Sequence, residues 1–450
     1  MGEAEAASEA QAPRRTLSLL RVVALLMAGC SAGPYGFEEC VGSGGAGLTI
    51  LGLLTVPFVW SLPLALVTAE LSTAIPENGG HIVWVDRALG SFWSYQNSFL
   101  SFVGNVFECA VYPAMFVDYL GKLYGREFET SERFTLCLLA VSFFLLVNVR
   151  GGSTSVGDVS MAISVVGLTP FLLMIIVGAP SVSTAHVFQR TADFGAVNWR
   201  SFLTILLWNT SGYDFVGAIA GEVKNPTLTI PSALAVTLLG TIAIDTLAVV
   251  VGVSVETDHK AWSDGHFMVC GLRLGGIPLQ TAFVLGATVS TLGLLCSMML
   301  TTSWFLAGMA KCGTAPKIFA QIHETYSTPW VAMTFNAAFI AAATVLDFGA
   351  IAELEMWLYC ASTVLKFAAF FVLRYREKTL ERPFKVPLAS RGALAVFIAC
   401  PIALCMLLMT LARVRTQIVG VGVMVLAAIV YRSVPPLERS LPVALEMIAD

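Results

Sequence analysis

Residues 25–38 read Leu25-Leu26-Met27-Ala28-Gly29-Cys30-Ser31-Ala32-Gly33-Pro34-Tyr35-Gly36-Phe37-Glu38. They belong to a hydrophobic segment that is long enough to span a bilayer, but Gly and Pro interrupt it near its middle. A helix broken at that depth leaves backbone N–H and C=O groups unpaired, which lipid does not tolerate unless these groups line a cavity or bind a ligand. The stretch therefore predicts a discontinuous membrane helix.

Residues 206–215 repeat this feature in the second half of the chain, as Leu206-Leu207-Trp208-Asn209-Thr210-Ser211-Gly212-Tyr213-Asp214-Phe215. Both interruptions share a pattern, Gly-Pro-Tyr-Gly-Phe-Glu in the first and Gly-Tyr-Asp-Phe in the second, each with an acid near its end. Broken helices at corresponding positions of two halves are the best sequence indication of a transporter's binding site. We therefore expect the rest of the chain to be arranged around these two breaks.

The composition is that of a polytopic membrane protein. Hydrophobic residues make up 56% of the 450 residues and charged residues only 12%, which is about half the charged share of soluble domains. The net charge of −4 gives no reason to expect nucleic acid as a partner. The ten cysteines form no CxxC pair, the histidines form no metal-spaced cluster, and no nucleophile–base pair is evident. We therefore expect no metal, no cofactor and no enzymatic activity.

Hydrophobic segments of about 20 residues predict an all-α membrane protein with twelve transmembrane helices. Lys and Arg are more frequent on the side of the two termini, sixteen against nine on the opposite side. This bias places both termini in the cytoplasm, and the plasma membrane is the expected location. The predicted helices are 17–42, 46–74, 92–121, 133–150, 157–178, 198–222, 231–253, 279–309, 329–346, 352–374, 391–411 and 414–432.

The two breaks divide the predicted helices into two repeats of five. Because the number of spans in each repeat is odd, the repeats are inverted relative to each other. The predicted segments are a cytoplasmic tail (1–16), repeat 1 (17–178, with its first helix broken near 29–36), an extracellular loop (179–197), repeat 2 (198–376, broken near 209–214), a cytoplasmic linker (377–390), two further helices (391–432) and a cytoplasmic tail (433–450).

Acidic residues outnumber basic ones inside the predicted spans. An ionisable group at bilayer depth is costly and is a functional candidate by default. Lys366 is the clear basic counterpart, so the surplus of acid suits a cationic substrate, a coupling cation or protons. The acids are Glu38, Glu39, Glu70, Glu108, Asp214 and Asp245.

Glu108 has two polar neighbours on one helix face, Asn105 and Tyr112, at spacings of three and four residues. A carboxylate can pair with an ammonium group, and a tyrosine ring adds cation–π attraction. We expect this face to contact a substrate, and a bond from Glu108 to a neighbouring helix is the alternative.

Asp214 follows the second break directly. A carboxylate in apolar surroundings can exchange protons near neutral pH, so Asp214 is a candidate for proton coupling, with capping of the broken helix as the alternative. Trp208 precedes the break and is a candidate gate or a packing residue, whereas Asn209 can offer its amide to a substrate. Glu38 adjoins the first break, where it either attracts cations or caps a helix.

Several stretches resemble the amino acid–polyamine–organocation superfamily, and most of all its polyamine uptake transporters from plants and trypanosomatid protozoa. The resemblance covers residues 17–432. The stretches that carry it are Gly33-Pro34-Tyr35-Gly36-Phe37-Glu38, Pro76-Glu77-Asn78-Gly79-Gly80, Ala110-Val111-Tyr112-Pro113 with Glu108 before it, Trp208-Asn209, Ala220-Gly221-Glu222-Val223-Lys224-Asn225-Pro226, Leu358-Tyr359-Cys360 and Arg382-Pro383-Phe384.

This resemblance implies a LeuT-like fold of five plus five inverted helices, followed by two C-terminal helices. It implies a substrate site between the two broken helices and predicted helices 3, 8 and 10. One departure is that Lys366 stands where a carboxylate is expected in the plant relatives. The implied site comprises the backbone around Gly29, Ser31, Gly33 and Tyr35 and the side chains of Asn105, Glu108, Tyr112, Trp208, Asn209 and Tyr359.

The function expected from these observations is import of polyamines such as putrescine and spermidine by proton symport with alternating access. Helices 1, 2, 6 and 7 would rock as a bundle, and Glu108, with Glu38, would pair with substrate ammonium groups. One alternative is a carrier of cationic or other amino acids, in which the free helix ends at the breaks hold a carboxylate. A second alternative is a non-transporting sensor, which would bind without flux.

Overall fold

The computed structural model describes residue 15 and residues 17–30, 33–77, 79–151, 156–187, 194–311, 315–388 and 390–433. Within these ranges the protein is helical, apart from turns and one isolated parallel bridge between Leu17 and Val223. Eight helical segments are long and apolar enough to cross a membrane. They are Ala46–Ala74 (α4, Ala46–Val59, and α5, Ser61–Ala74), α7 (Ser91–Tyr124), α8 (Thr130–Gly151), α13 (Pro226–Val255), α14 (His266–Lys311), α16 (Phe348–Arg376), α17 (Arg391–Leu411) and α18 (Val414–Ser433).

The remaining helices are shorter. α2 (Leu19–Cys30) and α3 (Phe37–Gly44) flank residues 31–36, and α11 (Trp199–Asn209) and α12 (Phe215–Ala218) flank residues 210–214. α9 (Val156–Gly178) and α15 (Trp330–Ala343) are also apolar, and the short α6 (His81–Leu89) follows Gly79 and Gly80. Each of the twelve predicted segments thus overlaps a helix or a pair of helices.

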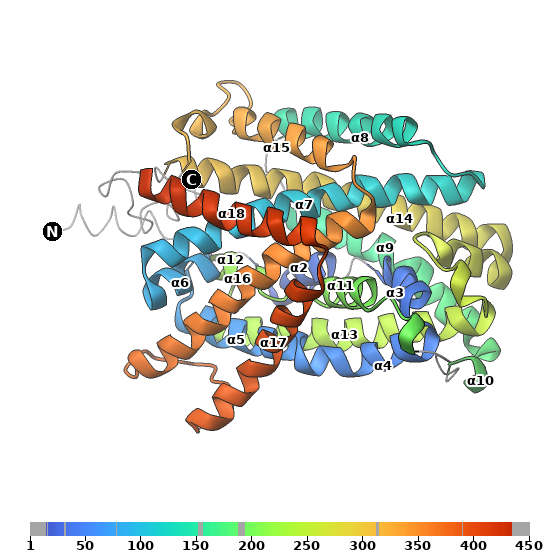
Figure 1. Cartoon of the computed structure of the whole chain (residues 1–450), viewed down its shortest axis with the longest axis horizontal. Coiled ribbons are helices and arrows are strands. Elements are labelled where there is room, and N and C mark those ends of the chain that lie inside the picture. The colour runs from blue at the N-terminus through green and yellow to red at the C-terminus, as the bar shows by residue number, and fades with distance from the viewer. Residues whose placement is uncertain are drawn as a thin grey trace.

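The short broken helices lie in the middle of the molecule (Figure 1). α8 and α15 pack against each other along one edge, and α4, α5 and α13 lie along the opposite edge. Between these edges, α2 packs on α9 and α13, while α7 contacts α14 and α16. This arrangement surrounds the polar backbone of the breaks with protein, as a hydrocarbon environment requires.

Large apolar side chains serve two purposes in this fold. Some fill the interior, such as Phe171, which contacts Tyr35, Phe267 and Phe283 edge to face with ring centroids 4.7–5.1 Å apart. Others point outward from the long helices, such as Ile176, which is 72% exposed. Exposed apolar faces on long helices are expected where the solvent is lipid.

Two helices differ from the predicted boundaries. α14 begins at His266 rather than at residue 279, but Gly276 has non-helical dihedral angles (φ 64°, ψ −158°) and Pro278 follows it. The predicted start therefore coincides with a kink, because hydropathy detects the apolar span and not the helical turns that precede it. The second difference is that α4 and α5 are separated by a turn at Trp60, which the continuous apolar pattern of residues 46–74 did not indicate.

One end of the molecule, which we call the linker end, is held by the buried carboxylate of Glu70 on α5. This carboxylate pairs with Arg374 at the end of α16 and, at 3.0 Å, with Arg382. It also accepts the backbone N–H of Val386 at 2.8 Å. Glu70 therefore fastens residues 377–388 to the helix bundle, where Arg87 of α6 also pairs with Glu377 at 2.7 Å.

Candidate functional site

The first break is stabilised by Glu38, the second residue of α3. One carboxylate oxygen of Glu38 accepts the backbone N–H of Gly36 at 2.7 Å, and the other accepts the Tyr119 hydroxyl at 2.9 Å. Gly33 and Gly36 have positive φ angles of 113° and 96°, which explains why glycine occupies both positions. Glu38 is fully buried, so this geometry corresponds to the helix-capping alternative. Ser31 lies outside the described residues.

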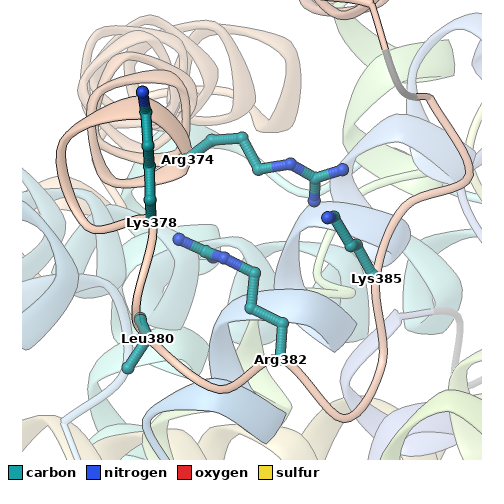
Figure 2. Close-up of a pocket in the computed structure, with 5 residues that line it drawn as sticks. All are labelled: Arg374, Lys378, Leu380, Arg382 and Lys385. Carbon is teal, nitrogen blue, oxygen red and sulfur yellow. The ribbon is translucent and has the colours of Figure 1, made fainter.

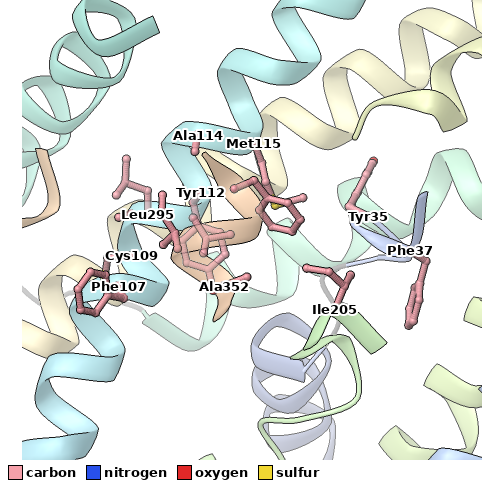
Figure 3. Packing of buried hydrophobic residues seen from close by; sticks show 14 of the residues in the cluster. Tyr35, Phe37, Phe107, Cys109, Tyr112, Ala114, Met115, Ile205, Leu295 and Ala352 are labelled. Carbon is pink, nitrogen blue, oxygen red and sulfur yellow. The ribbon is translucent and has the colours of Figure 1, made fainter. Parts of the chain in front are cut away.

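Tyr35 lies in the first break, and its ring is so close to Gly33 that a Cβ atom there would lie 3.0 Å from it. Its ring contacts Tyr119 and Phe171 edge to face, and its hydroxyl donates to the Gly167 carbonyl on α9 at 3.3 Å. Figure 3 shows Tyr35 with Tyr112 and Ile205 among the side chains of one buried cluster. The contacts of Tyr35 are therefore those of a residue that anchors the break to α9.

Two side chains at the junction of α4 and α5 donate hydrogen bonds to the second break. The Trp60 indole donates to the Ser211 hydroxyl at 3.0 Å, and the Ser61 hydroxyl donates to the Thr210 carbonyl at 2.6 Å. The Asn209 amide donates back to Ile205 of its own helix at 3.1 Å. Sequence analysis missed Trp60, and the Trp-Ser pair inside an otherwise apolar segment is the signal that could have indicated it.

The two breaks lie directly against each other. A Cβ atom on Gly212, whose φ is 91°, would lie 3.0 Å from the Gly29 carbonyl oxygen. A Cβ on Gly36 would lie 3.2 Å from the Asn209 amide and 3.3 Å from the Trp208 ring. Glycine at both positions therefore permits the two interrupted helices to approach at backbone distance.

Replacing Gly212 by alanine is expected to lower the stability of the protein by about 1–2 kcal/mol, because a non-glycine residue is strained at positive φ and the new methyl group meets the Gly29 carbonyl. The measurement is thermal unfolding of the purified variant. Gly29→Ala is the matched control, because Gly29 is helical and a Cβ there has no atom within 4 Å. Equal melting temperatures for the two variants would contradict the close approach.

Asp214 is held in an ion pair. Its two carboxylate oxygens accept the Lys366 ammonium group and, at 2.7 Å, the Tyr359 hydroxyl, both from α16. The Lys366 nitrogen also lies 4.6 Å from the centre of the Tyr359 ring, and the Tyr359 hydroxyl lies 3.4 Å from the Gly212 nitrogen. Sequence analysis expected apolar surroundings for Asp214. The structure differs because Tyr359 and Lys366 are two helical turns apart and share a face of α16.

Glu108 faces the interior from α7. Its carboxylate accepts the Tyr112 hydroxyl one turn later at 3.0 Å, and both Glu108 and Asn105 are partly accessible. Electrostatic interactions connect Glu108 with Asp214 and with Cys30, the last residue of α2. The structure thus brings Glu108, Tyr112, Asp214 and the end of α2 into one region.

Trp208 lies in α11, just before the second break. Its ring contacts Phe348, the first residue of α16, edge to face with ring centroids 5.7 Å apart.

Glu355 on α16 is the main residue that sequence analysis missed. It is 6% exposed, and its Oε2 atom has no hydrogen-bond partner among the described residues. It interacts electrostatically with Glu108, Lys366 and Asp214. The spacing of Glu355, Tyr359, Ser362 and Lys366 repeats every three or four residues along α16, and this pattern could have indicated a polar face.

Buried polar residues continue from α16 toward the linker end. The Ser362 hydroxyl donates to the Asn97 side chain at 2.7 Å, and the Asn97 amide nitrogen lies 2.7 Å from Nδ1 of His81, the first residue of α6. His81 interacts electrostatically with Lys366 and Asp214. Polar groups therefore connect the region of the breaks with the short helix at this end.

Acidic residues gather at the opposite end of the molecule. Glu39 on α3 interacts with Asp118, Asp264 and Asp347, and Lys122 partly balances them. Asp264 lies in the loop between α13 and α14, where burial and then the charge of Glu39 raise the pKa of its carboxyl well above its usual range. Asp118 pairs with Arg133, so among the described residues the acid without an ion pair at this end is mainly that of Glu39 and Asp347, and such negative charge attracts cations.

A central polar site beside two interrupted helices is an arrangement typical of membrane transporters. The model of the amino acid permease family matches residues 17–433 of this chain. The chain belongs to this family and is a multi-pass membrane transporter, not an enzyme.

Among curated proteins, the chain is similar to polyamine transporter PUT1 of Oryza sativa subsp. japonica, with 32% identity over 94% of this chain and 79% of that protein. It is similar to polyamine transporter RMV1 of Arabidopsis thaliana, with 32% identity over 96% of this chain and 89% of that protein. A more distant relative is the serine/threonine exchanger SteT of Bacillus subtilis, with 25% identity over 73% of this chain and 76% of that protein. The predicted resemblance to polyamine transporters is therefore confirmed.

Proposed function

We propose that this protein imports polyamines such as putrescine and spermidine by proton symport with alternating access. The observation that carries the proposal is the pair of carboxylates Glu108 and Glu355, which interact electrostatically beside the two breaks. Asp214 is already paired with Lys366. Glu108 and Glu355 are therefore the carboxylates that can bind a substrate ammonium group. The names of the plant relatives, polyamine transporters, support the same substrate class.

Polyamines carry ammonium groups on methylene chains, so a site for them needs carboxylates and aromatic faces. Tyr112 adjoins Glu108, and the ring of Tyr359 already lies beneath an ammonium group, that of Lys366. An ammonium group over an aromatic ring gains about 0.5–2 kcal/mol. In the proposal, Glu108 and Glu355 bind the substrate cation, Asn105, Tyr112, Trp208, Asn209 and Tyr359 line its path, and the backbone of the first break, at Gly29, Ser31, Gly33 and Tyr35, borders the site.

Asp214 is the residue we propose for proton coupling. A proton on Asp214 would abolish its ion pair with Lys366, which connects the second break to α16. Loss of that connection would free α11 and α12 to move with α2, α3, α4, α5 and α13 as a bundle. Glu38 enters this scheme as the cap that holds the first break together, since both of its oxygens are already bonded.

The proposed membrane topology has twelve spans. α2 and α3 together form one broken span, and α11 and α12 together form another. Residues 17–178 and 198–376 form the inverted LeuT-like repeats, and 391–432 form the two additional helices. Both termini and the linker 377–390 face the cytoplasm, 179–197 is extracellular, and the membrane is the plasma membrane. The acidic residues Glu39 and Asp347 would then lie on the outer side and attract cations.

A carrier of amino acids is the second candidate. The relative named as a serine/threonine exchanger favours it, and so do the free backbone groups of the breaks, which could hold a carboxylate. A polyamine has no carboxylate, so the two candidates differ in what they require from the breaks.

The experiment is uptake of radiolabelled putrescine, spermidine and arginine into proteoliposomes that contain the purified protein. We expect uptake of putrescine and spermidine to increase when the outside is made acidic, and to decline when a protonophore dissipates the gradient. If arginine is taken up and putrescine is not, polyamine transport is contradicted. If putrescine uptake does not depend on the proton gradient, proton symport is contradicted.

A further inference from the structure

A pocket of about 290 Å³ opens at the linker end, between the end of α16 and the linker. Figure 2 shows the charged ends of Arg374, Arg382 and Lys385 directed into it, with Lys378 along its side and Leu380 below. It lies away from the breaks, and nothing in the transport scheme uses it. Its lining is unusual for a membrane protein because four of its five residues are cationic.

The positive charges of the pocket outnumber the nearby acids, which are Glu70, Glu377 and the exposed Glu381. Glu70 lies beneath it and neutralises one of the four positive charges while pairing with both arginines. Glu377 is engaged by Arg87 at 2.7 Å. In the described part of the chain, the ammonium groups of Lys378 and Lys385 have neither a hydrogen-bond nor an ion-pair partner, and both residues are exposed. The pocket therefore has free donors and a surplus of positive charge.

The arginines are fixed in place and so preorganise the pocket. Arg374 donates to the carbonyls of Val386 and Leu388 at 3.0 and 3.3 Å, and Arg382 donates to the carbonyl of Leu373 at 2.8 Å. These bonds hold the linker in a curve around the end of α16. A ligand would therefore bind mainly to Lys385, with Lys378 at the side of the pocket, and the two arginines would contribute their charge without rearranging.

We propose that this pocket binds a phosphate group, carried either by the headgroup of an anionic phospholipid or by a soluble phosphate ester. Phosphate matches several converging cationic donors, and basic pockets between membrane helices receive lipid headgroups. The surroundings favour the lipid. Arg391, at the start of α17, stacks on Tyr375 at 4.8 Å, and Val396 one turn later is 73% exposed. A headgroup in the pocket would thus have an apolar helix face beside it for its acyl chains.

The test measures binding of dioctanoyl phosphatidylglycerol to the full-length protein in detergent, with dioctanoyl phosphatidylcholine as the uncharged comparison. We expect the anionic lipid to bind more tightly than phosphatidylcholine. We expect Lys378→Gln/Lys385→Gln to weaken binding of the anionic lipid by roughly ten- to thirtyfold, since each basic residue near a lipid surface contributes a factor of about five. Competition by glycerol 3-phosphate would identify a soluble ester as the source of the phosphate, and absence of competition would identify the lipid.

The matched control is Lys224→Gln/Lys311→Gln, which removes the same charge from two exposed lysines outside the pocket. This control should bind phosphatidylglycerol like the wild type. The proposal is overturned if the pocket variant binds the anionic lipid as tightly as the wild type, or if the control variant loses as much affinity as the pocket variant. Neither result depends on which substrate the protein transports.

Discussion

Replacing Glu108 by glutamine is expected to lower the kcat/KM of putrescine uptake by about ten- to a hundredfold. The substitution keeps the shape of the side chain and a partner for the Tyr112 hydroxyl, but it removes the negative charge that we propose pairs with the substrate. A hydrogen bond to a charged group contributes about 1.5–3 kcal/mol, which corresponds to this range. The measurement is the initial rate of radiolabelled putrescine uptake into proteoliposomes at several concentrations.

Glu132→Gln is the control for Glu108→Gln. Glu132 is an exposed acid that pairs with Arg126 at 3.0 Å, in the first turn of α8. Glu132→Gln changes the net charge by the same amount as Glu108→Gln but alters no residue near the breaks. Putrescine uptake should therefore stay at the wild-type rate. Unchanged uptake by Glu108→Gln would remove Glu108 from the cation site.

Replacing Lys366 by methionine is expected to destabilise the protein by about 3–5 kcal/mol. The methionine fills a similar volume, but it leaves the buried Asp214 carboxylate without its ion-pair partner, and an uncompensated buried charge has a cost of this size. The measurement is the melting temperature of the purified variant. Lys366→Met/Asp214→Asn should recover much of the loss, because the double variant has no unpaired charge.

Lys311→Met is the control for Lys366→Met, since Lys311 is an exposed lysine at the end of α14. We expect its melting temperature to match that of the wild type. If the double variant Lys366→Met/Asp214→Asn melts no higher than Lys366→Met alone, the ion pair is not what stabilises this region.

Local patterns predicted where most of the helices and the two breaks lie, but not the turn at Trp60 or the first turns of α14. Apolar length locates a membrane helix regardless of its neighbours, and Gly33 and Gly212 interrupt the pattern where the structure interrupts the helices. Family stretches pointed to Trp208, Asn209 and Tyr359, all of which lie at or near the second break. Such patterns do not show which group each polar side chain bonds, because its hydrogen-bond or ion-pair partner comes from a distant part of the chain.

Three residues illustrate this limit. Glu38 accepts a hydrogen bond from Tyr119, which is 81 residues away, so its sequence neighbours could not distinguish a cap from a cation site. In the sequence Trp60 is one more apolar residue of its segment, and its partner Ser211 lies 151 residues away. Glu355 stands near the start of the predicted span 352–374. Its helical spacing from Tyr359 and Lys366 places it on the same face of α16 as these two residues.

Glu353 and Glu355 offer the sharpest comparison, since they lie two residues apart on α16. Glu353 accepts the backbone N–H of Arg413 at 2.6 Å and the Thr416 hydroxyl at 2.7 Å, so its carboxylate holds the start of α18. Glu355 interacts electrostatically with Glu108 and has an oxygen with no hydrogen-bond partner in the described structure. Glu353→Gln should therefore lower the melting temperature and leave substrate affinity unchanged.

The most direct test of the cation site is equilibrium binding of radiolabelled putrescine to the purified wild type and to Glu355→Gln. The account predicts that Glu355→Gln raises the Kd for putrescine by at least about tenfold, the effect of losing one charged partner, while it melts no lower than the wild type. Putrescine affinity equal to that of the wild type in Glu355→Gln would contradict it.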